Sequence, residues 1–344
     1  MAVKVIHVGV GGWGLDWEQN IVSNVPSIER VAAVDASPAI LEAAQEAVGI
    51  SPDVCFSSLT EAMATVEAEA ALITVPLPFH MPVVLEALDL GLNALVEKPF
   101  APTVAEAKNA VSVAAEKGLL LAVSQNYRFF PAVQTVKQIV ESGELGKVGS
   151  VSIDFRKHVT VDGGGHRHFS LPDPLLVDMA IHHWDLMRYL LGDEATAITC
   201  ETWNPLWSPF VEDAAGAAVV EFSEGAHVAW RGSWVSPGEP TTWSGVWHME
   251  FERGEVIWRA RGDRGTTADD FVIVRPVGGK EERRKLPALP LHGRRGSLNA
   301  FAEAVASGTL PTPDISGANN IGTIELALTS VESAAAGRRI TLGG

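Results

Sequence analysis

The turn at residues 9–14, Gly-Val-Gly-Gly-Trp-Gly, follows a short apolar run at Val3–Val8 and constrains the start of the chain more than any other feature. Its glycines are spaced as Gly-x-Gly-x-x-Gly, at Gly9, Gly11 and Gly14. In such a turn the first glycine permits a tight bend, the second lets the backbone approach a pyrophosphate, and the third lets a helix pack closely on the strand. The N-terminus of that helix offers backbone N–H groups to phosphate oxygens. The motif therefore predicts a strand–turn–helix unit that binds a phosphate-containing ligand.

Short apolar runs alternate with helix-forming segments over the first third of the chain. The predicted strands are Val3–Val8, Arg30–Asp35, Ala70–Val75, Asn93–Glu97 and Leu119–Ser124, and the predicted helices are Ala39–Val48, Met81–Leu90 and Val104–Glu116. Several of these strands are apolar on both faces, which is typical of strands buried inside a parallel sheet. The alternation predicts a doubly wound α/β domain of the Rossmann type over residues 1–125.

An acidic residue stands where a domain of this type holds the ribose of a dinucleotide. Asp35 ends the second predicted strand, 21 residues after Gly14. A carboxylate there accepts hydrogen bonds from the ribose hydroxyls and repels a 2′-phosphate. The residues that follow, Ala36-Ser37-Pro38, offer no arginine to such a phosphate. We therefore expect the cofactor to be NAD rather than NADP, with Gly12 and Trp13 among the residues that bind it.

The pattern of the sequence changes after Tyr127. Helices are predicted at Pro131–Glu141, Leu175–Leu191, Ser297–Ser307 and Gly317–Ala336, and strands at Lys147–Phe155, Thr196–Trp203, Ala214–Phe222, Ala226–Trp234, Val246–Phe251, Glu255–Trp258 and Asp270–Val274. Short strands that follow one another through turns predict a largely antiparallel sheet. A chain of 344 residues is also long enough for two domains. We expect residues 126–344 to form an α+β domain with a large, mostly antiparallel open sheet that binds substrate.

The composition argues against several classes of partner. The chain has 42 acidic and 26 basic residues and a formal net charge of -16, whereas nucleic acids and anionic membranes require clustered Lys and Arg. It contains no apolar stretch of the ~20 residues that a membrane-spanning helix needs. The N-terminus lacks the features of a signal peptide, and the two cysteines, Cys55 and Cys200, form no paired motif. We expect a cytoplasmic protein that acts on a small molecule.

Two groups of residues are candidates for chemistry. Lys98 follows the fifth predicted strand, at the sheet edge where α/β proteins place their ligands, and a lysine there can stabilise negative charge on a substrate oxygen. Asp178, His182 and Asp185 are spaced by four and three residues, which predicts one common helix face and a His whose tautomer an Asp fixes. His183 points elsewhere and is the weaker candidate. Taken alone, the pattern favours a buried structural histidine over a general base.

Several motifs in this order resemble the glucose–fructose oxidoreductase/inositol dehydrogenase (Gfo/Idh/MocA) family. They are the glycine turn, Asp35, Thr74-Val75-Pro76 with His80, Glu97-Lys98-Pro99, Asn126-Tyr127-Arg128-Phe129, Asp178 with His182 and Asp185, and a tail with Phe301, Ala304, Gly308, Pro311 and Gly337-Arg338-Arg339. The resemblance covers nearly the whole chain. One departure is Ala180, where many members carry Gly.

The resemblance implies a set of roles for these residues. Lys98 and Asp178 would hold the reacting hydroxyl while His182 removes its proton, and a hydride would pass to C4 of the nicotinamide. The residues implied for cofactor binding beyond the turn and Asp35 are Val75, Pro76, His80, Glu97 and Lys98. Those implied for substrate binding are Tyr127 and Arg128, with Lys98, Asp178 and His182. Family members also oligomerise through the second sheet, which implies a homodimer or homotetramer here.

The loop Gly163–His168 precedes the predicted helix of His182 and is a further candidate for substrate contact, through His166. With His168, His182 and Asp178, His166 could supply ligands for Zn²⁺. A lysine at the reacting oxygen makes a Lewis acid unnecessary, so we expect no metal.

These features together predict an NAD-dependent dehydrogenase that interconverts a secondary hydroxyl and a ketone on a sugar, cyclitol or related polyol. One alternative is a glycosidase on the same scaffold that uses NAD for transient oxidation. Another is a non-catalytic NAD-dependent sensor, although Lys98, Asp178 and His182 argue against it because a sensor does not need them.

Overall fold

The computed structural model describes residues 2–159 and 167–343, and the chain divides into two compact units. The first unit is Met1–Asn126 with Leu291–Ile321, and the second is Tyr127–Pro290 with Gly322–Gly344. The division at Asn126 lies one residue beyond the expected boundary. The segment Leu291–Ile321, which we expected in the second domain, belongs to the first unit.

A six-stranded parallel sheet forms the centre of the first unit, in the order β3-β2-β1-β4-β5-β6. Its strands are β1 (Val3–Val8), β2 (Ile28–Val34), β3 (Cys55–Phe56), β4 (Ala70–Ile73), β5 (Asn93–Val96) and β6 (Leu121–Val123). All four residues of β4 are buried, which explains why the central strands are apolar on both faces. The strand order and the parallel pairing confirm the predicted Rossmann fold.

Helices connect the strands of this sheet. They are α1 (Trp13–Asn20), α2 (Pro38–Val48), α3 (Leu59–Met63), α4 (His80–Asp89) and α5 (Val104–Lys117), with short 3₁₀ turns η1 (Val22–Asn24), η2 (Pro52–Val54) and η3 (Leu77–Phe79). Thr103 caps α5 because its hydroxyl accepts a hydrogen bond from the N–H of Glu106. Pro38 occupies the first turn of α2, where a missing N–H costs nothing. The three helices predicted in this region are confirmed.

The segment Leu291–Ile321 returns to the first unit and carries helix α8 (Arg294–Ser307). The Ser27 hydroxyl donates to the side-chain oxygen of Asn299 at 2.7 Å. The N–H of Val123, in β6, donates to the carbonyl of Ile315 at 2.9 Å. These bonds join residues from opposite ends of the sequence, so the first unit is complete only when this segment is present.

The second unit contains a nine-stranded sheet in the order β14-β13-β12-β11-β7-β10-β9-β8-β15. The strands are β7 (Val148–Arg156), β8 (Ala195–Trp203), β9 (Ala215–Phe222), β10 (His227–Ser233), β11 (Val246–Phe251), β12 (Gly254–Arg259), β13 (Phe271–Pro276), β14 (Glu282–Arg283) and β15 (Ile340–Thr341). Strands β7 and β10 pair in parallel, and the other neighbours pair in antiparallel fashion. The prediction of a large, mostly antiparallel sheet is confirmed.

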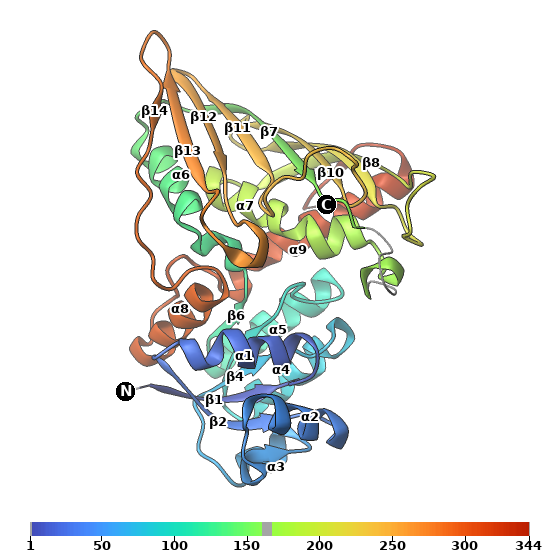
Figure 1. Ribbon diagram of the computed structural model, residues 1–344, viewed down its shortest axis with the longest axis vertical. Helices are drawn as coiled ribbons and strands as arrows, with labels where there is room; N and C mark the ends of the chain where they lie inside the picture. Colours follow the sequence, from blue (N-terminus) through green and yellow to red (C-terminus); the bar gives the residue numbers. More distant parts are fainter. Residues whose placement is uncertain (1, 160–166, 344) are drawn as a thin grey trace. The chain divides into compact units, whose positions relative to one another are not determined.

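One face of this sheet is covered by helices, as Figure 1 shows for α6, α7 and α9. The helical segments are α6 (Pro131–Ser142), α7 (Ile181–Leu191) and α9 (Gly317–Ala336), with the 3₁₀ turns η4 (Asn126–Phe129), η5 (Arg167–Ser170) and η7 (Asp263–Gly265) and the π-helical segment η6 (Pro174–Met179). Trp230, Trp247 and Trp258 are buried in this unit. Neighbouring positions such as Ala229 and His248 are exposed, so the strands alternate between a packed and an open face.

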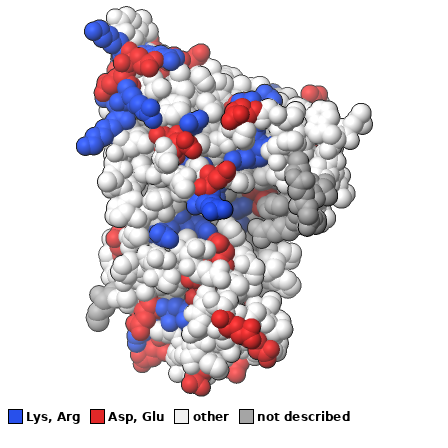
Figure 2. Space-filling model, in the orientation of Figure 1, with Lys and Arg blue, Asp and Glu red and all other residues white. Residues whose placement is uncertain are grey.

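Charged side chains of both signs are interspersed on the face of the molecule seen in Figure 2, and no continuous basic area covers it. Among the described residues, no helix is both long and apolar enough to cross a membrane.

Candidate functional site

The glycine turn adopts a conformation that its glycines alone permit. Gly9 has a φ of 88°, and a Cβ on it would lie 2.7 Å from Val75. A Cβ on Gly14 would lie 1.7 Å from the carbonyl oxygen of Gly9, which explains the close approach of α1 to the turn. A Cβ on Gly12, at the N-terminus of α1, would meet no atom within 4 Å. The turn therefore offers an open cradle beside a helix N-terminus, and it fits the pyrophosphate of a dinucleotide.

Asp35 lies beside this cradle. It directly follows β2, and the carbonyl of Val34 accepts a hydrogen bond from the N–H of Gly9 at 2.8 Å. One carboxylate oxygen of Asp35 accepts a hydrogen bond from the N–H of Ser37 at 3.0 Å, which orients the side chain. The carboxylate thus stands at the sheet edge next to the turn, in the position that suits the ribose hydroxyls of NAD.

A buried polar network lies beneath the turn, and the sequence analysis missed it. His7, in β1, contacts the Glu18 carboxylate at 2.6 Å and the Thr74 hydroxyl at 2.8 Å, and that hydroxyl donates to the carbonyl of Gly9 at 2.7 Å. Burial opposes ionisation of Glu18, but its bonds to His7 and Arg30 outweigh this and hold its pKa below the usual value. The network ties the turn to two strands and compensates the charge of Glu18. A polar residue in the middle of an apolar strand was the signal that could have revealed it.

Arg294, from α8, packs on the turn and was also missed. Its guanidinium lies 4.2 Å from the ring centre of Trp13 and 5.4 Å from that of Trp17, and it pairs with Asp16 at 2.5 Å. Asp16 therefore has a cationic partner and does not leave an uncompensated negative charge near the pyrophosphate. The sequence contains no local signal for this contact, because 278 residues separate the pair.

The residues that follow β5, Glu97 and Lys98, are the next part of the candidate cofactor site in the first unit. The Glu97 carboxylate is buried, accepts a hydrogen bond from the indole N–H of Trp17 at 2.9 Å and accepts another from the backbone N–H of Lys98 at 3.0 Å. Lys98 is half-buried. Trp17 and Glu97 thus connect α1 to the strand end that carries Lys98, the expected catalytic lysine.

His80 is buried and joins two loops of the first unit. Its ring nitrogens lie 2.9 Å from the carbonyl of Val75 and 2.8 Å from that of Pro99. Burial lowers the pKa of His80, although bonds to these carbonyls oppose the shift. The loop after β4, with Val75 and Pro76, is therefore held to the loop after β5. In this structure His80 acts by positioning those loops.

In the second unit, the predicted helix Leu175–Leu191 is two segments rather than one. Residues Pro174–Met179 are π-helical, and the N–H of Ala180 donates to the carbonyl of Leu175 at 2.8 Å before α7 begins. Asp178 lies in the π segment and His182 in α7. The prediction of one continuous helix over Leu175–Leu191 is therefore wrong, because the π segment interrupts the regular spacing between Asp178 and His182. Single π turns of this kind recur at functional sites.

His182 packs against Tyr127. The two rings are stacked, with centroids 3.9 Å apart and planes 6° apart, and both side chains are nearly buried. The Tyr127 hydroxyl accepts a hydrogen bond from Arg261 at 2.8 Å. Burial raises the pKa of Tyr127 to about 12, with Arg261 opposing and Asp178 adding to the shift, so the phenol stays protonated. Asp178 is therefore close enough to Tyr127 to influence its ionisation.

Asp185 and Arg128 form a buried ion pair. Their bonds measure 2.8 and 2.6 Å, and Thr323 donates to the same carboxylate at 3.0 Å. The exposed fractions of Arg128 and Asp185 are 2% and 1%. Asp185 is therefore engaged by Arg128 and Thr323. We assign Arg128 a structural role in this unit.

His183, the weaker candidate for catalysis, has a structural role. Its Nδ1 accepts a hydrogen bond from the indole N–H of Trp230 at 3.1 Å, and its Nε2 lies 3.2 Å from the carbonyl of Trp243. This arrangement requires the neutral ring, since Nδ1 must accept. Complete burial lowers the pKa of His183 to about 4, against the effect of the Trp243 carbonyl.

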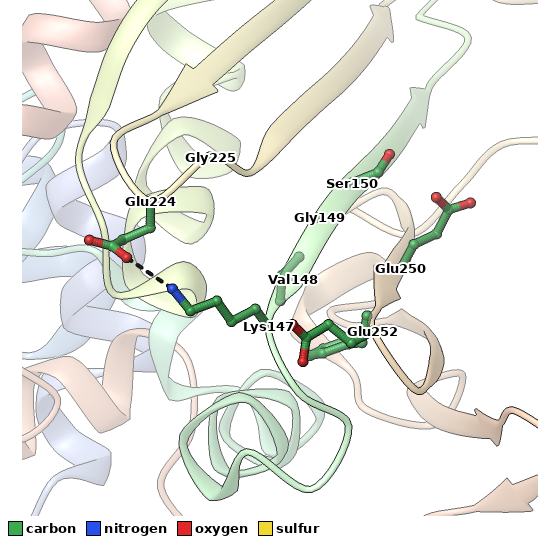
Figure 3. Close-up of a pocket in the computed structure, with 9 residues that line it drawn as sticks. Lys147, Val148, Gly149, Ser150, Glu224, Gly225, Glu250 and Glu252 are labelled. Atoms are coloured by element: carbon green, nitrogen blue, oxygen red, sulfur yellow. Dashed lines mark hydrogen bonds and ion pairs between the residues drawn. The ribbon is translucent and has the colours of Figure 1, made fainter.

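His166 lies outside the described residues. The part of the chain that the structure describes contains no group of three His, Cys, Asp or Glu residues able to hold a metal ion. A pocket at the start of β7, where Lys147 reaches Glu224 at 3.3 Å, contains none of the predicted site residues (Figure 3).

Comparison with known proteins agrees with this picture. A family model described as an oxidoreductase family with an NAD-binding Rossmann fold matches residues 3–125, and the GFO/IDH/MocA C-terminal domain matches residues 133–266. The uncharacterized protein y4oX of Sinorhizobium fredii is 30% identical over 279 residues, which are 78% of this chain and 73% of that protein. The scyllo-inositol 2-dehydrogenase (NAD(+)) of Bacillus subtilis is 26% identical, over 68% of each chain.

Among solved structures, levoglucosan dehydrogenase in complex with NADH and levoglucosan has a TM-score of 0.80 at 19% identity and covers 100% of both chains. The similarity in fold therefore covers both units of the chain. The two family matches and the relatives confirm the resemblance that the sequence motifs carry. The chain belongs to the Gfo/Idh/MocA family and is an NAD-binding oxidoreductase, a dehydrogenase of the kind that acts on CH–OH groups.

Proposed function

We propose that this protein interconverts a secondary hydroxyl and a ketone on a sugar, cyclitol or related polyol. The observation that carries the proposal is the division of labour between the paired histidines of α7. His183 is held neutral by Trp230 and Trp243. His183 therefore fills the structural role. His182, which stacks on Tyr127, is the residue that we assign to proton transfer.

The residues divide the chemistry between them. Lys98 and Asp178 hold the substrate hydroxyl, and the positive charge of Lys98 stabilises negative charge on its oxygen as the proton leaves. His182 accepts that proton as general base. NAD, when bound at the glycine turn and Asp35, supplies the nicotinamide carbon that accepts the hydride. Tyr127 contacts His182 and keeps water from the buried face of its ring.

The substrate class rests on the relatives. One relative is named as a scyllo-inositol dehydrogenase and one neighbour in fold as a levoglucosan dehydrogenase, and both names denote polyhydroxylated rings. A lysine and a carboxylate at one hydroxyl suit such substrates, because neighbouring hydroxyls can donate and accept additional hydrogen bonds. We therefore propose cyclitols and sugars as the first compounds to test, with NAD as the cofactor.

Lys98→Ala and His182→Ala test the site. We expect each variant to retain binding of NAD and to lose kcat by about 100-fold or more, because each removes a group that acts on the reacting hydroxyl. Isothermal titration calorimetry measures NAD binding, and absorbance of NADH measures turnover of a panel of inositols and sugars. Lys108→Ala and His227→Ala change exposed residues of the same types and should stay near wild type. Full activity in Lys98→Ala and His182→Ala would disprove the assignment.

The same assay separates the rival functions. A glycosidase that uses NAD transiently would cleave a glycoside without accumulating NADH. A sensor would bind NAD and turn over no compound of the panel. Net formation of NADH with a free polyol supports the dehydrogenase.

Assembly and location extend the proposal. We propose a homodimer or homotetramer formed through the open face of the nine-stranded sheet, where Ala229 and Val219 are exposed side by side on neighbouring strands. A cytoplasmic location stays a prediction; the free thiols of Cys55 and Cys200 support it.

A further inference from the structure

Arg261 combines an unfavourable backbone conformation with a set of specific side-chain contacts. It follows β12 with a φ of 61°, in the left-handed region that residues other than glycine seldom adopt. Such a conformation persists when surrounding contacts hold it, and these conformations cluster at functional sites. The contacts of the Arg261 side chain are therefore candidates for a functional role.

The Arg261 guanidinium lies against two aromatic rings. It is 4.7 Å from the ring centre of Tyr127 and 5.1 Å from that of Trp243, and it donates a hydrogen bond to the Tyr127 hydroxyl at 2.8 Å. A planar guanidinium suits this arrangement because it can stack and donate at once. Tyr127 is thereby held both at its hydroxyl and at its ring.

Trp243 is itself firmly placed. Its indole N–H donates to Asp263 at 2.9 Å, its backbone N–H donates to the carbonyl of Arg261 at 2.9 Å, and the Lys157 ammonium lies 4.6 Å from its ring centre. Lys157 and Asp263 pair at 3.0 Å. The surface on which Arg261 rests is therefore fixed by bonds of its own, independently of Tyr127.

Tyr127 passes this restraint to His182. The two rings lie face to face, 3.9 Å apart and 6° from parallel, and the exposed fractions of Tyr127 and His182 are 2% and 6%. Rotation of the imidazole about its own axis would break the stack. A general base must present one nitrogen in one direction, and small misplacements of reacting groups cost large factors in rate.

We propose that Arg261 is a positioning residue for His182, which acts by clamping Tyr127 and, through its ring, the plane of the imidazole. This inference rests on the proposed role of His182 as general base. It assigns a catalytic effect to a residue of the β12–β13 loop that contributes no group to the reaction itself.

Arg261→Gln tests the proposal because it removes both the stack and the charge. With the polyol that the wild type oxidises, we expect kcat to fall by about 10-fold to 100-fold while NAD affinity stays unchanged. The solvent deuterium isotope effect on kcat should rise, since proton transfer becomes slower relative to other steps. Arg261→Lys keeps the charge and a donor and should recover part of kcat. Tyr127→Phe keeps the ring, loses the acceptor and should give an intermediate loss.

Arg264→Gln is the matched control, since Arg264 lies in the same loop, is exposed and also has a left-handed φ, of 57°. If Arg261→Gln stays within twofold of this control, or if its loss is confined to KM with no change in the isotope effect, the proposal is wrong. Unfolding of Arg261→Gln, checked by circular dichroism, would leave Arg261→Lys and Tyr127→Phe to decide by the same criteria.

An activity-independent measurement separates this inference from the proposed function. In protein labelled with ¹³C-histidine, the ring of Tyr127 should shift the Cε1–H resonance of His182, assigned by its absence in His182→Ala. We expect the shift to persist in Arg264→Gln and to be lost in Arg261→Gln. A shift that survives in Arg261→Gln overturns the clamp even if the enzyme oxidises polyols, whereas its loss supports the clamp even if no polyol is oxidised.

Discussion

At the scale of single residues, two adjacent histidines of α7 meet opposite environments. His183 is enclosed and must stay neutral to accept the bond from Trp230, whereas His182 lies against the flat face of Tyr127. The spacing around His182 alone favours a buried structural histidine over a general base. In the structure His183 is the structural histidine, and its neighbour His182 is the proposed catalytic one.

The lowered pKa of His183 leads to a prediction about the stability of the protein in acid. Its pKa falls from 6.5 in the unfolded chain to about 4 in the folded protein. Between these values the unfolded state binds more protons, so the stability that His183 contributes is present above pH 6.5 and is lost as the pH falls towards 4. Thermal unfolding from pH 7.5 to 4.5 should therefore show a smaller decrease in Tm for His183→Gln than for wild type. Parallel Tm profiles would contradict the assignment.

The position of the Asp35 carboxylate leads to a prediction about the preference for NAD over NADP. Its carboxylate repels a 2′-phosphate at the position of the ribose, so Asp35→Ala should reduce the preference for NAD over NADP by about 10-fold or more. Steady-state kcat/KM with each cofactor measures the ratio. Asp53→Ala, which removes an exposed carboxylate from η2, should leave the ratio unchanged. An equal ratio in Asp35→Ala and wild type would remove Asp35 from the ribose site.

The residues that the sequence revealed are those whose role depends on local spacing. Gly9, Gly14 and Asp35 follow a fixed pattern after a strand, and Lys98 follows another strand at the same sheet edge. His7, Arg261 and Arg294 act through partners far along the chain. No periodicity or motif encodes these partners, and the polar His7 in an apolar strand signals only that a buried partner exists.

At the scale of elements, hydrophobic periodicity located most strands and helices. The prediction for β1 matches the observed Val3–Val8 residue for residue, and α5 begins at the predicted Val104. The π segment before α7 escaped detection because its residues are as apolar as those of a regular helix. The two-residue strand β3 was too short to show a pattern.

The contact of helix α8 with the glycine turn leads to a prediction about the affinity for NAD. Arg294 stacks on Trp13 and pairs with Asp16, so it supports the turn that receives the pyrophosphate. Arg294→Ala should weaken NAD binding by about 3-fold to 10-fold, the value expected for one half-buried cation–π contact and its ion pair. Isothermal titration calorimetry measures the change. Arg295→Ala loses a bond to the Asn20 carbonyl at the end of α1 and should change NAD affinity less; equal losses would show a general destabilisation instead.

At the scale of the whole molecule, the open face of the nine-stranded sheet makes a prediction about assembly. Ala229 lies on β10 between Ser152 of β7 and Val219 of β9, and all three are exposed. If two copies associate through this face, Ala229→Glu places like charges opposite each other and should yield a monomer of 36.6 kDa. Light scattering after size-exclusion chromatography measures the mass. Lys280→Glu, in the β13–β14 turn, should leave the assembly intact, and an unchanged mass in Ala229→Glu would exclude this face.

The order of the chain has a consequence for how the protein is made and cut. Ser316 bridges to Ala122 in β6, and Arg294 contacts the glycine turn near the N-terminus. During synthesis the first unit therefore cannot be completed until the segment Leu291–Ile321 has left the ribosome. A gene fragment ending at Asn126 would encode the whole six-stranded sheet and yet omit the helix that braces its nucleotide turn. Swapping cofactor domains between relatives would thus require moving two stretches of coding sequence together.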